Sequence, residues 1–127
     1  MSSYQVKEEV IGFVEILKSK FTAFVFPISN VEEFQTRLEQ IRKANPKAKH
    51  VVYAFKVGVS SKSTDDREPK GTAGRPLLEL LNKKNLNNTA IIVVRYFGGS
   101  ELGASRLLRT YVASAVDAIN KAELIEF

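Results

Sequence analysis

Five consecutive apolar residues, Ala90-Ile91-Ile92-Val93-Val94, place the strongest constraint on the fold of this chain. A strand that is apolar at every position is typical of the centre of a sheet, where other elements cover it. Residues 8–17 and 21–26 are rich in β-branched and aromatic types and are separated by a short polar stretch, so they predict a hairpin. Residues 50–58 place alternate apolar side chains on one face, which predicts a further strand.

Three segments show the spacing of amphipathic helices. The first helix follows Ser29 or Asn30, and either residue is able to cap its N-terminus. Proline has no backbone N–H, so Pro76 must stand among the first residues of the second helix. That helix is therefore expected to begin close to Gly74 or Arg75.

The third helix is predicted from about residue 102 to residue 121. Residues 59–71 are polar and are expected to form a loop. The 127 residues thus predict one α+β domain, residues 1–127, in the order β-β-α-β-α-β-α. Its four-stranded β-sheet is expected to carry the three helices on one face.

Composition limits the functional classes. The chain has no Cys, which excludes disulfides, thiolate zinc sites and cysteine nucleophiles. It shows no apolar run of the roughly 18 residues that a membrane span requires, so we predict a cytoplasmic protein with no membrane partner. The formal net charge of +5 permits contact with nucleic acid, although solubility alone also explains it.

Two glycine-rich junctions, residues 64–76 and 95–103, lead into the second and third helices. The unpaired N–H groups and the positive dipole end of a helix N-terminus favour an anion, and glycine lets the anion approach the backbone. The residues that would surround such an anion are Gly71, Thr72, Ala73, Gly74, Gly98, Gly99 and Gly103. Neither junction has the spacing of a known phosphate loop, so plain turn geometry is the alternative.

Arg95 follows the apolar strand, where a buried cation needs a partner. One interpretation is a structural ion pair with Asp65, Asp66 or Glu68, which would hold the long loop against the sheet. The alternative is that Arg95 converges with Arg75 and Arg109 on an anionic ligand, while the acidic residues orient the cations.

The sequence offers no catalytic set. His50 is the only histidine and begins a strand, where a packing role is expected. Thr72 lacks a recognisable base, so its expected role is capping or loop hydrogen bonding. The acidic residues of the first junction do not have the spacing of a calcium loop. We therefore predict no metal, no cofactor and no enzymatic activity.

The two junctions together resemble a known family signature. Residues 65–76, followed by Val94-Arg95-Tyr96-Phe97-Gly98-Gly99 and Leu102-Gly103-Ala104, are similar to the motifs of the Impact N-terminal domain. Bacterial YigZ-type proteins and eukaryotic Impact proteins share this domain. The resemblance extends over nearly the whole chain and implies a fold like the second domain of a small-subunit ribosomal protein.

The resemblance also implies a role around translation. Eukaryotic relatives bind a ribosome-associated activator and so restrain a stress kinase, and a nucleic-acid-binding role is supposed for bacterial relatives. This chain departs from the pattern where the family has glycine in place of Arg67, a basic residue in place of Glu101, and two glycines in place of Ser105 and Arg106. Bacterial relatives commonly carry a second domain and eukaryotic ones an extra N-terminal domain, and residues 123–127 are a candidate stub of an absent second domain.

We therefore predict a non-enzymatic, translation-associated or regulatory domain that binds a ribosome-associated protein or RNA. The alternative is a binder of a phosphate-bearing small molecule or nucleotide, or an enzyme, that uses the two helix N-termini. A third possibility is a partner-facing edge at residues 124–127. The sequence leaves the oligomeric state open. The predicted site residues are Asp65, Asp66, Glu68, Gly71, Thr72, Ala73, Gly74, Arg75, Arg95, Gly98, Gly99, Gly103, Arg106 and Arg109.

Overall fold

A computed structural model describes residues 2–127. The elements in chain order are β1 (Tyr4–Val6), β2 (Val10–Ile16), β3 (Ser19–Pro27), α1 (Val31–Ala44), β4 (His50–Val57), β5 (Ser60–Thr64), α2 (Gly74–Lys83), β6 (Thr89–Tyr96), α3 (Ala104–Ile119) and β7 (Leu124–Glu126). The main sheet has the strand order β2-β3-β6-β4-β5, and every neighbouring pair is antiparallel. A small second sheet pairs β1 with β7.

The main sheet has five strands, so the prediction of four is wrong. The additional strand is β5, which pairs with β4 from Val57↔Ser60 to Tyr53↔Thr64 and lies in the segment expected to be a loop. Its residues are all polar, and its side chains are exposed or half-buried. An edge strand of this kind shows no apolar alternation, because neither of its faces is buried. The pattern that identified the other strands was therefore missing.

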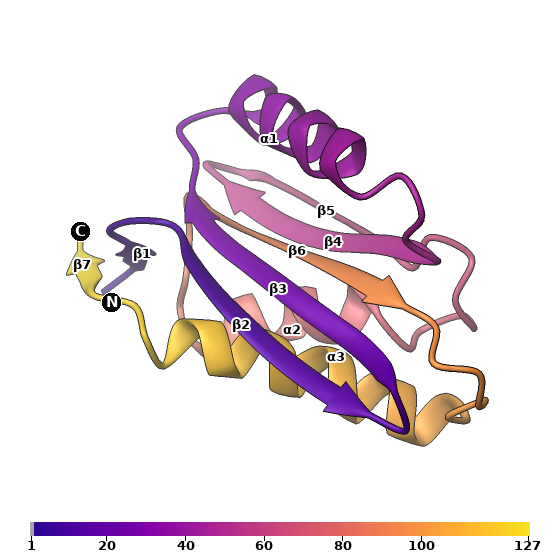
Figure 1. Ribbon diagram of the computed structural model, residues 1–127. Helices are drawn as coiled ribbons and strands as arrows, with labels where there is room; N and C mark the ends of the chain where they lie inside the picture. The colour runs from indigo at the N-terminus through magenta and orange to yellow at the C-terminus, as the bar shows by residue number, and fades with distance from the viewer. Residues whose placement is uncertain (1) are drawn as a thin grey trace.

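Helices cover both faces of the sheet, and the expectation of helices on one face is also wrong (Figure 1). α1 lies on one face, while α2 and α3 lie on the other. The central strand β6 contributes to both cores: Ile91 and Val93 pack with α2 and α3, whereas Ile92 and Val94 pack with α1. The apolar run that predicted a central strand thus required cover on both of its faces.

Asn30, one of the two predicted caps, is the N-cap of α1. The Asn30 Oδ1 accepts a hydrogen bond from the Glu33 N–H at 2.9 Å, and the Glu33 Oε1 accepts one from the Ser29 N–H at 2.9 Å. The first bond is that of an N-cap, whereas the Glu33 carboxylate reaches the residue before the cap and not the N–H of Asn30 itself. Asn30 is the cap and Ser29 is the residue before it.

Strand β2 forms one edge of the main sheet and packs tightly against α3. A Cβ at Gly12 would lie 2.2 Å from the Ser114 carbonyl oxygen and 2.4 Å from the Ala118 nitrogen. On the outer edge, the Phe13 N–H donates to the Asp117 carboxylate at 2.9 Å, and the Lys121 ammonium donates to the Ile11 carbonyl at 3.0 Å. Side chains of α3 therefore occupy part of the edge that would otherwise be open to another strand.

The C-terminal tail returns to the N-terminus, where β7 pairs with β1 from Tyr4↔Glu126 to Val6↔Leu124 (Figure 1). The side chains of Leu124, Ile125 and Phe127 remain 41%, 44% and 56% exposed. Within residues 2–127, none of the helices has the length and apolar character needed to cross a bilayer.

Candidate functional site

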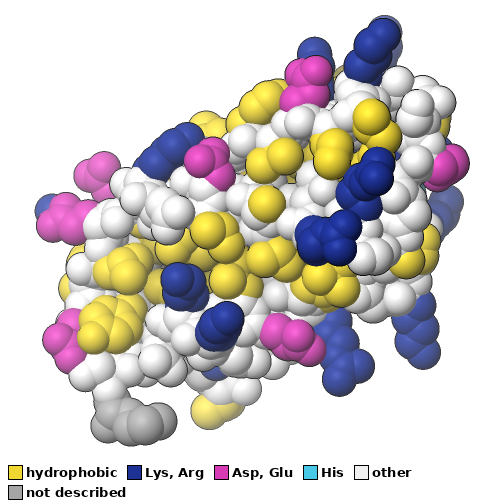
Figure 2. Space-filling model, turned by 90° about the horizontal axis from the view of Figure 1, so that it is seen from below, with side chains coloured by type: hydrophobic (Ala, Val, Ile, Leu, Met, Phe, Trp, Pro, Cys, Tyr) yellow, Lys and Arg dark blue, Asp and Glu magenta, His cyan; other side chains and the backbone are white. Residues whose placement is uncertain are grey.

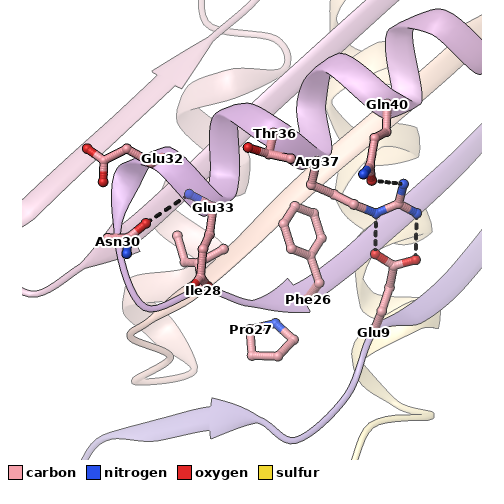
Figure 3. Close-up of a pocket in the computed structure, with 10 residues that line it drawn as sticks. All are labelled: Glu9, Phe26, Pro27, Ile28, Asn30, Glu32, Glu33, Thr36, Arg37 and Gln40. Carbon is pink, nitrogen blue, oxygen red and sulfur yellow. Dashed lines mark hydrogen bonds and ion pairs between the residues drawn. The ribbon is translucent and has the colours of Figure 1, made fainter.

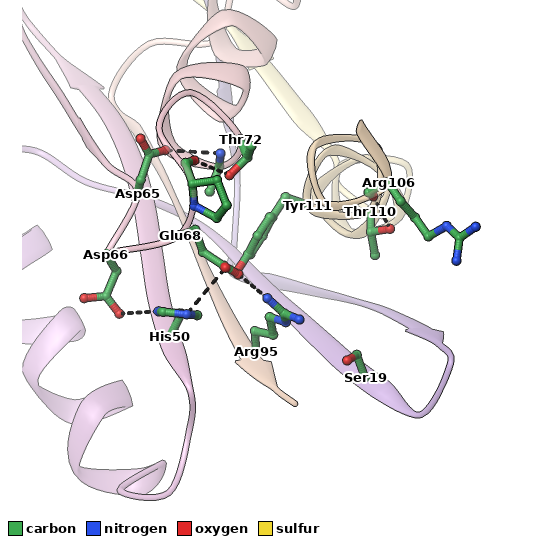
Figure 4. Close-up of polar contacts among 12 residues, drawn as sticks. Ser19, His50, Asp65, Asp66, Glu68, Thr72, Arg95, Arg106, Thr110 and Tyr111 are labelled. Atoms are coloured by element: carbon green, nitrogen blue, oxygen red, sulfur yellow. Dashed lines mark hydrogen bonds and ion pairs between the residues drawn. The ribbon is translucent and has the colours of Figure 1, made fainter. Parts of the chain in front are cut away.

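The predicted site residues of both junctions lie near the C-terminal end of β6. At this end β4 begins opposite it, since His50 pairs with Arg95. The loop after β5 carries Asp65, Asp66 and Glu68 past this end, and α3 supplies Tyr111, which points toward Glu68 and Arg95 (Figure 4). The structure therefore brings together segments that are more than forty positions apart in the chain.

Arg95 forms the expected ion pair, and its partner is Glu68. The Arg95 Nη1 donates to the Glu68 Oε2 at 2.6 Å, and the two side chains are only 3% and 4% exposed. The Tyr111 hydroxyl donates to the same carboxylate oxygen at 2.5 Å. Burial raises the pKa of Tyr111 above its usual range, and the hydrogen bond to Glu68 raises it further. The predicted ion pair between Arg95 and an acidic residue of the loop is thus confirmed, with Glu68 as the partner.

His50 lies between two carboxylates of the loop after β5, those of Asp66 and Glu68. Its Nε2 is 3.4 Å from the Glu68 Oε1, and its Nδ1 is 3.7 Å from the Asp66 Oδ2. Asp66 also accepts a hydrogen bond from the Val51 N–H at 2.8 Å. Asp66 therefore links the loop to the start of β4, while the buried His50 Nδ1 has no hydrogen-bond partner among the described residues.

Asp65 occupies the N-terminal region of α2. Its Oδ2 accepts from the Gly71 N–H at 2.9 Å, and its Oδ1 accepts from the N–H groups of Ala73 and Gly74 at 3.1 and 2.8 Å. The Thr72 hydroxyl donates to the Pro69 carbonyl at 2.5 Å, which is the loop role expected for it. A carboxylate of the protein itself therefore fills the place where the first junction was expected to hold an external anion.

The second junction is shaped by close approach of two backbones. The Gly98 N–H donates to the Ser19 Oγ at 3.0 Å, and a Cβ at Gly98 would lie 2.2 Å from the Lys18 carbonyl carbon. Gly99 and Gly103 have φ values of 97° and 78°, in the region that favours glycine. The N-cap position of α3, Gly103, provides no side chain to satisfy the first N–H groups.

The three arginines do not converge on one ligand position. Arg95 is buried against Glu68, whereas the Arg75 side chain is 79% exposed and pairs with Glu79 on its own helix. The Arg109 Nη1 donates to the Ser105 Oγ, one turn away on α3. The side chain of Arg106 points away from the buried cluster (Figure 4).

Arg67 has a φ of 68°, in the left-handed region of the backbone. The family resemblance implies glycine here, and the observed conformation gives the physical reason, because glycine adopts it without strain. The arginine side chain in this chain is exposed and adds a cation to the surface.

Exposed cations collect at this end of the molecule, which we call the basic end. Its members are Lys18, Lys20, Lys49, Arg67, Lys70, Arg106 and Arg109. They come from the β2–β3 turn, the start of β4, the loop after β5 and the first turns of α3. In Figure 2, Lys and Arg side chains gather toward the right-hand half of the molecule, the side on which β6 ends in Figure 1.

Sequence reasoning missed five cations of the basic end and two buried hydroxyl groups. Arg67 and Lys70 lie within the first junction but were not among the predicted site residues. Lys18, Lys20 and Lys49 lie outside both junctions, and their position at the ends of predicted strands was the available signal. Ser19 and Tyr111 are fully buried, and a hydroxyl in an apolar stripe was the signal that a polar partner was needed.

A surface groove lies elsewhere, between β3 and α1. It has a volume of about 580 Å³ and is lined by Phe26, Pro27 and Ile28 below and by polar groups of α1 above (Figure 3). Arg37 binds Glu9 through two hydrogen bonds of 2.7 Å, and Asn30 is bonded to the Glu33 N–H. Its central charged groups thus satisfy one another.

Comparison with known proteins identifies relatives of this chain. The family model of the Impact N-terminal domain matches residues 17–119. The chain is 38% identical to IMPACT family member YvyE of Bacillus subtilis over 128 residues, covering 98% of this chain and 59% of that protein. It is 33% identical to Protein IMPACT of Mus musculus over 95 residues, covering 70% of this chain and 30% of that protein.

One solved structure, a crystal structure of a hypothetical protein, superposes with a TM-score of 0.93 at 28% sequence identity. The superposition covers 99% of this chain and 64% of that one. The chain therefore spans about three-fifths of the length of its bacterial relative and of the solved structure.

Proposed function

Because the chain belongs to the Impact N-terminal domain family, we propose that it is a non-enzymatic, translation-associated regulatory domain that binds RNA in the cytoplasm through its basic end. The role around translation is what the family resemblance implies. The observation that carries the choice of RNA is the grouping of seven exposed cations around one end of the sheet.

The physical argument rests on the phosphate backbone. Lysine and arginine side chains that neutralise phosphates release counterions, which supplies most of the affinity for nucleic acid. The basic end also exposes Phe97, whose ring is 40% accessible, with the Lys49 Nζ 4.6 Å from the ring centroid. An exposed aromatic ring among cations is the arrangement on which an unpaired base stacks.

The buried cluster beneath this surface supports binding and not catalysis. Arg95, Tyr111 and His50 each contact Glu68, so the cluster stabilises the fold and holds the surrounding loops in place. Asp65 holds the first junction, which weakens the case for a nucleotide at the N-terminus of α2. The alternative function, binding of a phosphate-bearing small molecule, would therefore have to use the second junction, at the N-terminus of α3.

The test is the salt dependence of RNA binding, measured by fluorescence anisotropy with a labelled single-stranded RNA. Changing Lys70→Gln together with Arg106→Gln should weaken binding about tenfold. The plot of the logarithm of the binding constant against the logarithm of salt concentration should become less steep, by the amount expected for the loss of about one to two phosphate contacts. The matched control is Lys83→Gln with Lys84→Gln, which removes the same charge at the opposite end of α2 and should change the affinity less than about twofold.

Two results would contradict the proposal. The first is the absence of RNA binding at low salt. The second is an equal loss of affinity in the control, which would indicate attraction by net charge alone. Capture of a protein from a cell lysate that persists after RNase treatment would favour the alternative of a protein partner.

A further inference from the structure

We propose that β5, an edge strand of the main sheet, is a docking site for an extended acidic segment of a protein partner, which adds to the sheet as a further strand. This inference goes beyond the proposed function, because it concerns a protein partner and a strand that contributes none of the cations of the basic end. In this mode of recognition main-chain hydrogen bonds supply affinity, and side-chain contacts select the partner.

The two edges of the main sheet differ in how far they are blocked. At β2, the Asp117 carboxylate accepts from the Phe13 N–H and the Lys121 ammonium donates to the Ile11 carbonyl. At the opposite edge, β5 (Ser60–Thr64) pairs with β4 alone (Figure 1). Within residues 2–127, no group outside β4 is hydrogen-bonded to the main chain of β5. Alternate N–H and C=O groups of this strand are therefore free to pair with another chain.

There is space for an added strand on both faces of this edge. A groove of about 440 Å³ lies between β5 and α1, and its lining includes Arg42 and Lys62. A second groove, of about 220 Å³, lies beside the N-terminus of α2 and is lined in part by Ser63, Lys70 and Arg75. Three of the five residues of β5 are exposed and the other two are half-buried. Side chains of an added strand, which alternate between the faces, would thus have room on each.

Cations without a partner flank the edge on both faces. Lys62 shares the α1 face with Phe55, its partner in β4, and Arg42 lies across the groove on α1. Lys70 lines the groove on the other face. In the part of the chain that the structure describes, none of these three cations forms an ion pair. A carboxylate of an added strand would therefore meet an uncompensated cation on either face.

The two carboxylates that line these grooves already have partners. The Glu39 Oε1 lies 4.0 Å from the Lys43 Nζ, one turn along α1. Asp65 accepts hydrogen bonds from three N–H groups in the N-terminal region of α2. The charge that remains available beside β5 is thus positive, which favours an acidic segment over a basic one.

Lys62 also argues against a second copy of this chain as the occupant. It is the middle residue of β5, so in a symmetric antiparallel pairing of two β5 strands it would lie opposite its own copy. Like charges directly opposite each other destabilise a strand pair, and lysine on an edge strand is a common means of preventing self-association. An acidic strand from another protein converts the same charge into an attraction.

Fluorescence anisotropy with a short labelled peptide of alternating valine and glutamate tests the proposal. The matched probe is the same peptide with every backbone nitrogen methylated, which keeps the charge and removes the donors of the ladder. The first peptide should bind saturably and about tenfold more tightly than the second. In hydrogen exchange read by NMR, the unmethylated peptide should slow exchange in β5 and leave β2 unchanged, because side chains of α3 block that edge.

Lys62→Glu reverses the charge on the edge and should weaken peptide binding about fivefold or more, with circular dichroism confirming that the variant is folded. The matched control is Lys18→Glu, the same change within the basic end, which should weaken RNA binding and alter peptide binding less than about twofold.

Four results would overturn the proposal. The first is the absence of saturable peptide binding by the wild type, and the second is equal binding of the methylated peptide, which would indicate attraction by charge alone. The third is a loss in Lys18→Glu as large as that in Lys62→Glu. The fourth is slower exchange in β5 with single-stranded RNA but not with the peptide, which would assign this edge to the RNA surface.

Discussion

Glu68 is a carboxylate enclosed by groups that donate to it or lie within contact distance. Its side chain is 4% exposed and accepts hydrogen bonds from Arg95 and Tyr111. Burying a charge is unfavourable unless it is paired, and removing one partner leaves the other charge without compensation. Replacing Glu68 should therefore lower the free energy of unfolding by more than the loss of its own contacts alone.

We expect Glu68→Ala to lower the free energy of unfolding by about 3 to 5 kcal/mol, because Arg95 would remain buried and unpaired. Urea denaturation followed by circular dichroism measures this loss. Glu79→Ala removes the exposed pair with Arg75 and should cost less than about 1 kcal/mol. Similar losses in the two variants would show that the buried pair does not have the assigned role.

Tyr111 should make stability depend on alkaline pH. Its pKa is raised in the folded protein, mainly by burial, whereas in the unfolded chain it is about 10. A group with a raised folded pKa contributes fully below the unfolded pKa, and its contribution is lost as the pH rises above that value. The stability of the wild type should therefore fall above pH of about 10, by up to about 1.4 kcal/mol per pH unit for this single proton.

Urea denaturation at several values between neutral and alkaline pH, carried out in parallel on Tyr111→Phe, measures that contribution. Other titrating groups affect both proteins, so the difference between the two slopes isolates Tyr111. Parallel slopes above pH of about 10 would contradict the assignment.

At the scale of elements, the contact between β2 and α3 depends on one missing side chain. Gly12→Ala would place a Cβ against backbone atoms of Ser114 and Ala118, neither of which can rotate away. We expect a loss of about 3 kcal/mol, together with faster hydrogen exchange along β2 as the strand separates from the helix.

Gly58→Ala is the comparison for that change, since its Cβ would meet no atom within 4 Å and only its φ of 58° is unfavourable. Its cost should be about 1 kcal/mol, with no effect on exchange in β2. Hydrogen exchange read by NMR distinguishes the two outcomes. Unchanged hydrogen-exchange protection of β2 in Gly12→Ala would mean that α3, and not β2, moves to accommodate the added Cβ.

Sequence patterns were informative wherever burial imposed a period or a pairing. The central position of β6 and the need of Arg95 for an acidic partner followed from apolar residues and one cation in the same strand. The strand β5 did not follow, because an edge strand with polar residues on both faces has no period to detect. The choice of Glu68 over its two neighbours also required the structure, since three nearby carboxylates are equivalent by spacing alone.

The grouping of cations at the basic end could not be predicted from sequence patterns either. Lys18 and Lys49 are adjacent to strands that meet only through β6, so their proximity is a property of strand order and not of local sequence. The role of Asp65 was similarly hidden, because its three acceptor contacts reach Gly71, Ala73 and Gly74 across a loop whose path could not be predicted.

At the scale of the whole molecule, β7 is joined to the domain through β1, which is itself anchored by backbone hydrogen bonds of Tyr4 with Asn85 and Asn87. The three apolar side chains of the tail are 41% to 56% exposed, and β7 pairs only with β1. Deleting residues 124–127 should therefore cost about 1 kcal/mol, from a few solvated backbone hydrogen bonds. Hydrogen exchange in the main sheet should stay as in the full chain.

Analytical ultracentrifugation of the same deletion tests whether the tail is a partner-facing edge. An unchanged oligomeric state would indicate that the tail only pairs with β1 of its own chain. A change from dimer to monomer would instead support the third possibility raised by the sequence, in which the edge docks another chain.

The position of β6 has a consequence for synthesis of the protein. The β2–β3 and β4–β5 hairpins lie on opposite sides of β6 and do not pair with each other. Until residues 89–96 have left the ribosome, the two hairpins have apolar surfaces with no common partner. The nascent chain therefore stays in two separate halves until its sixth strand appears, and a ribosome that stalls before that strand leaves a fragment dependent on chaperones.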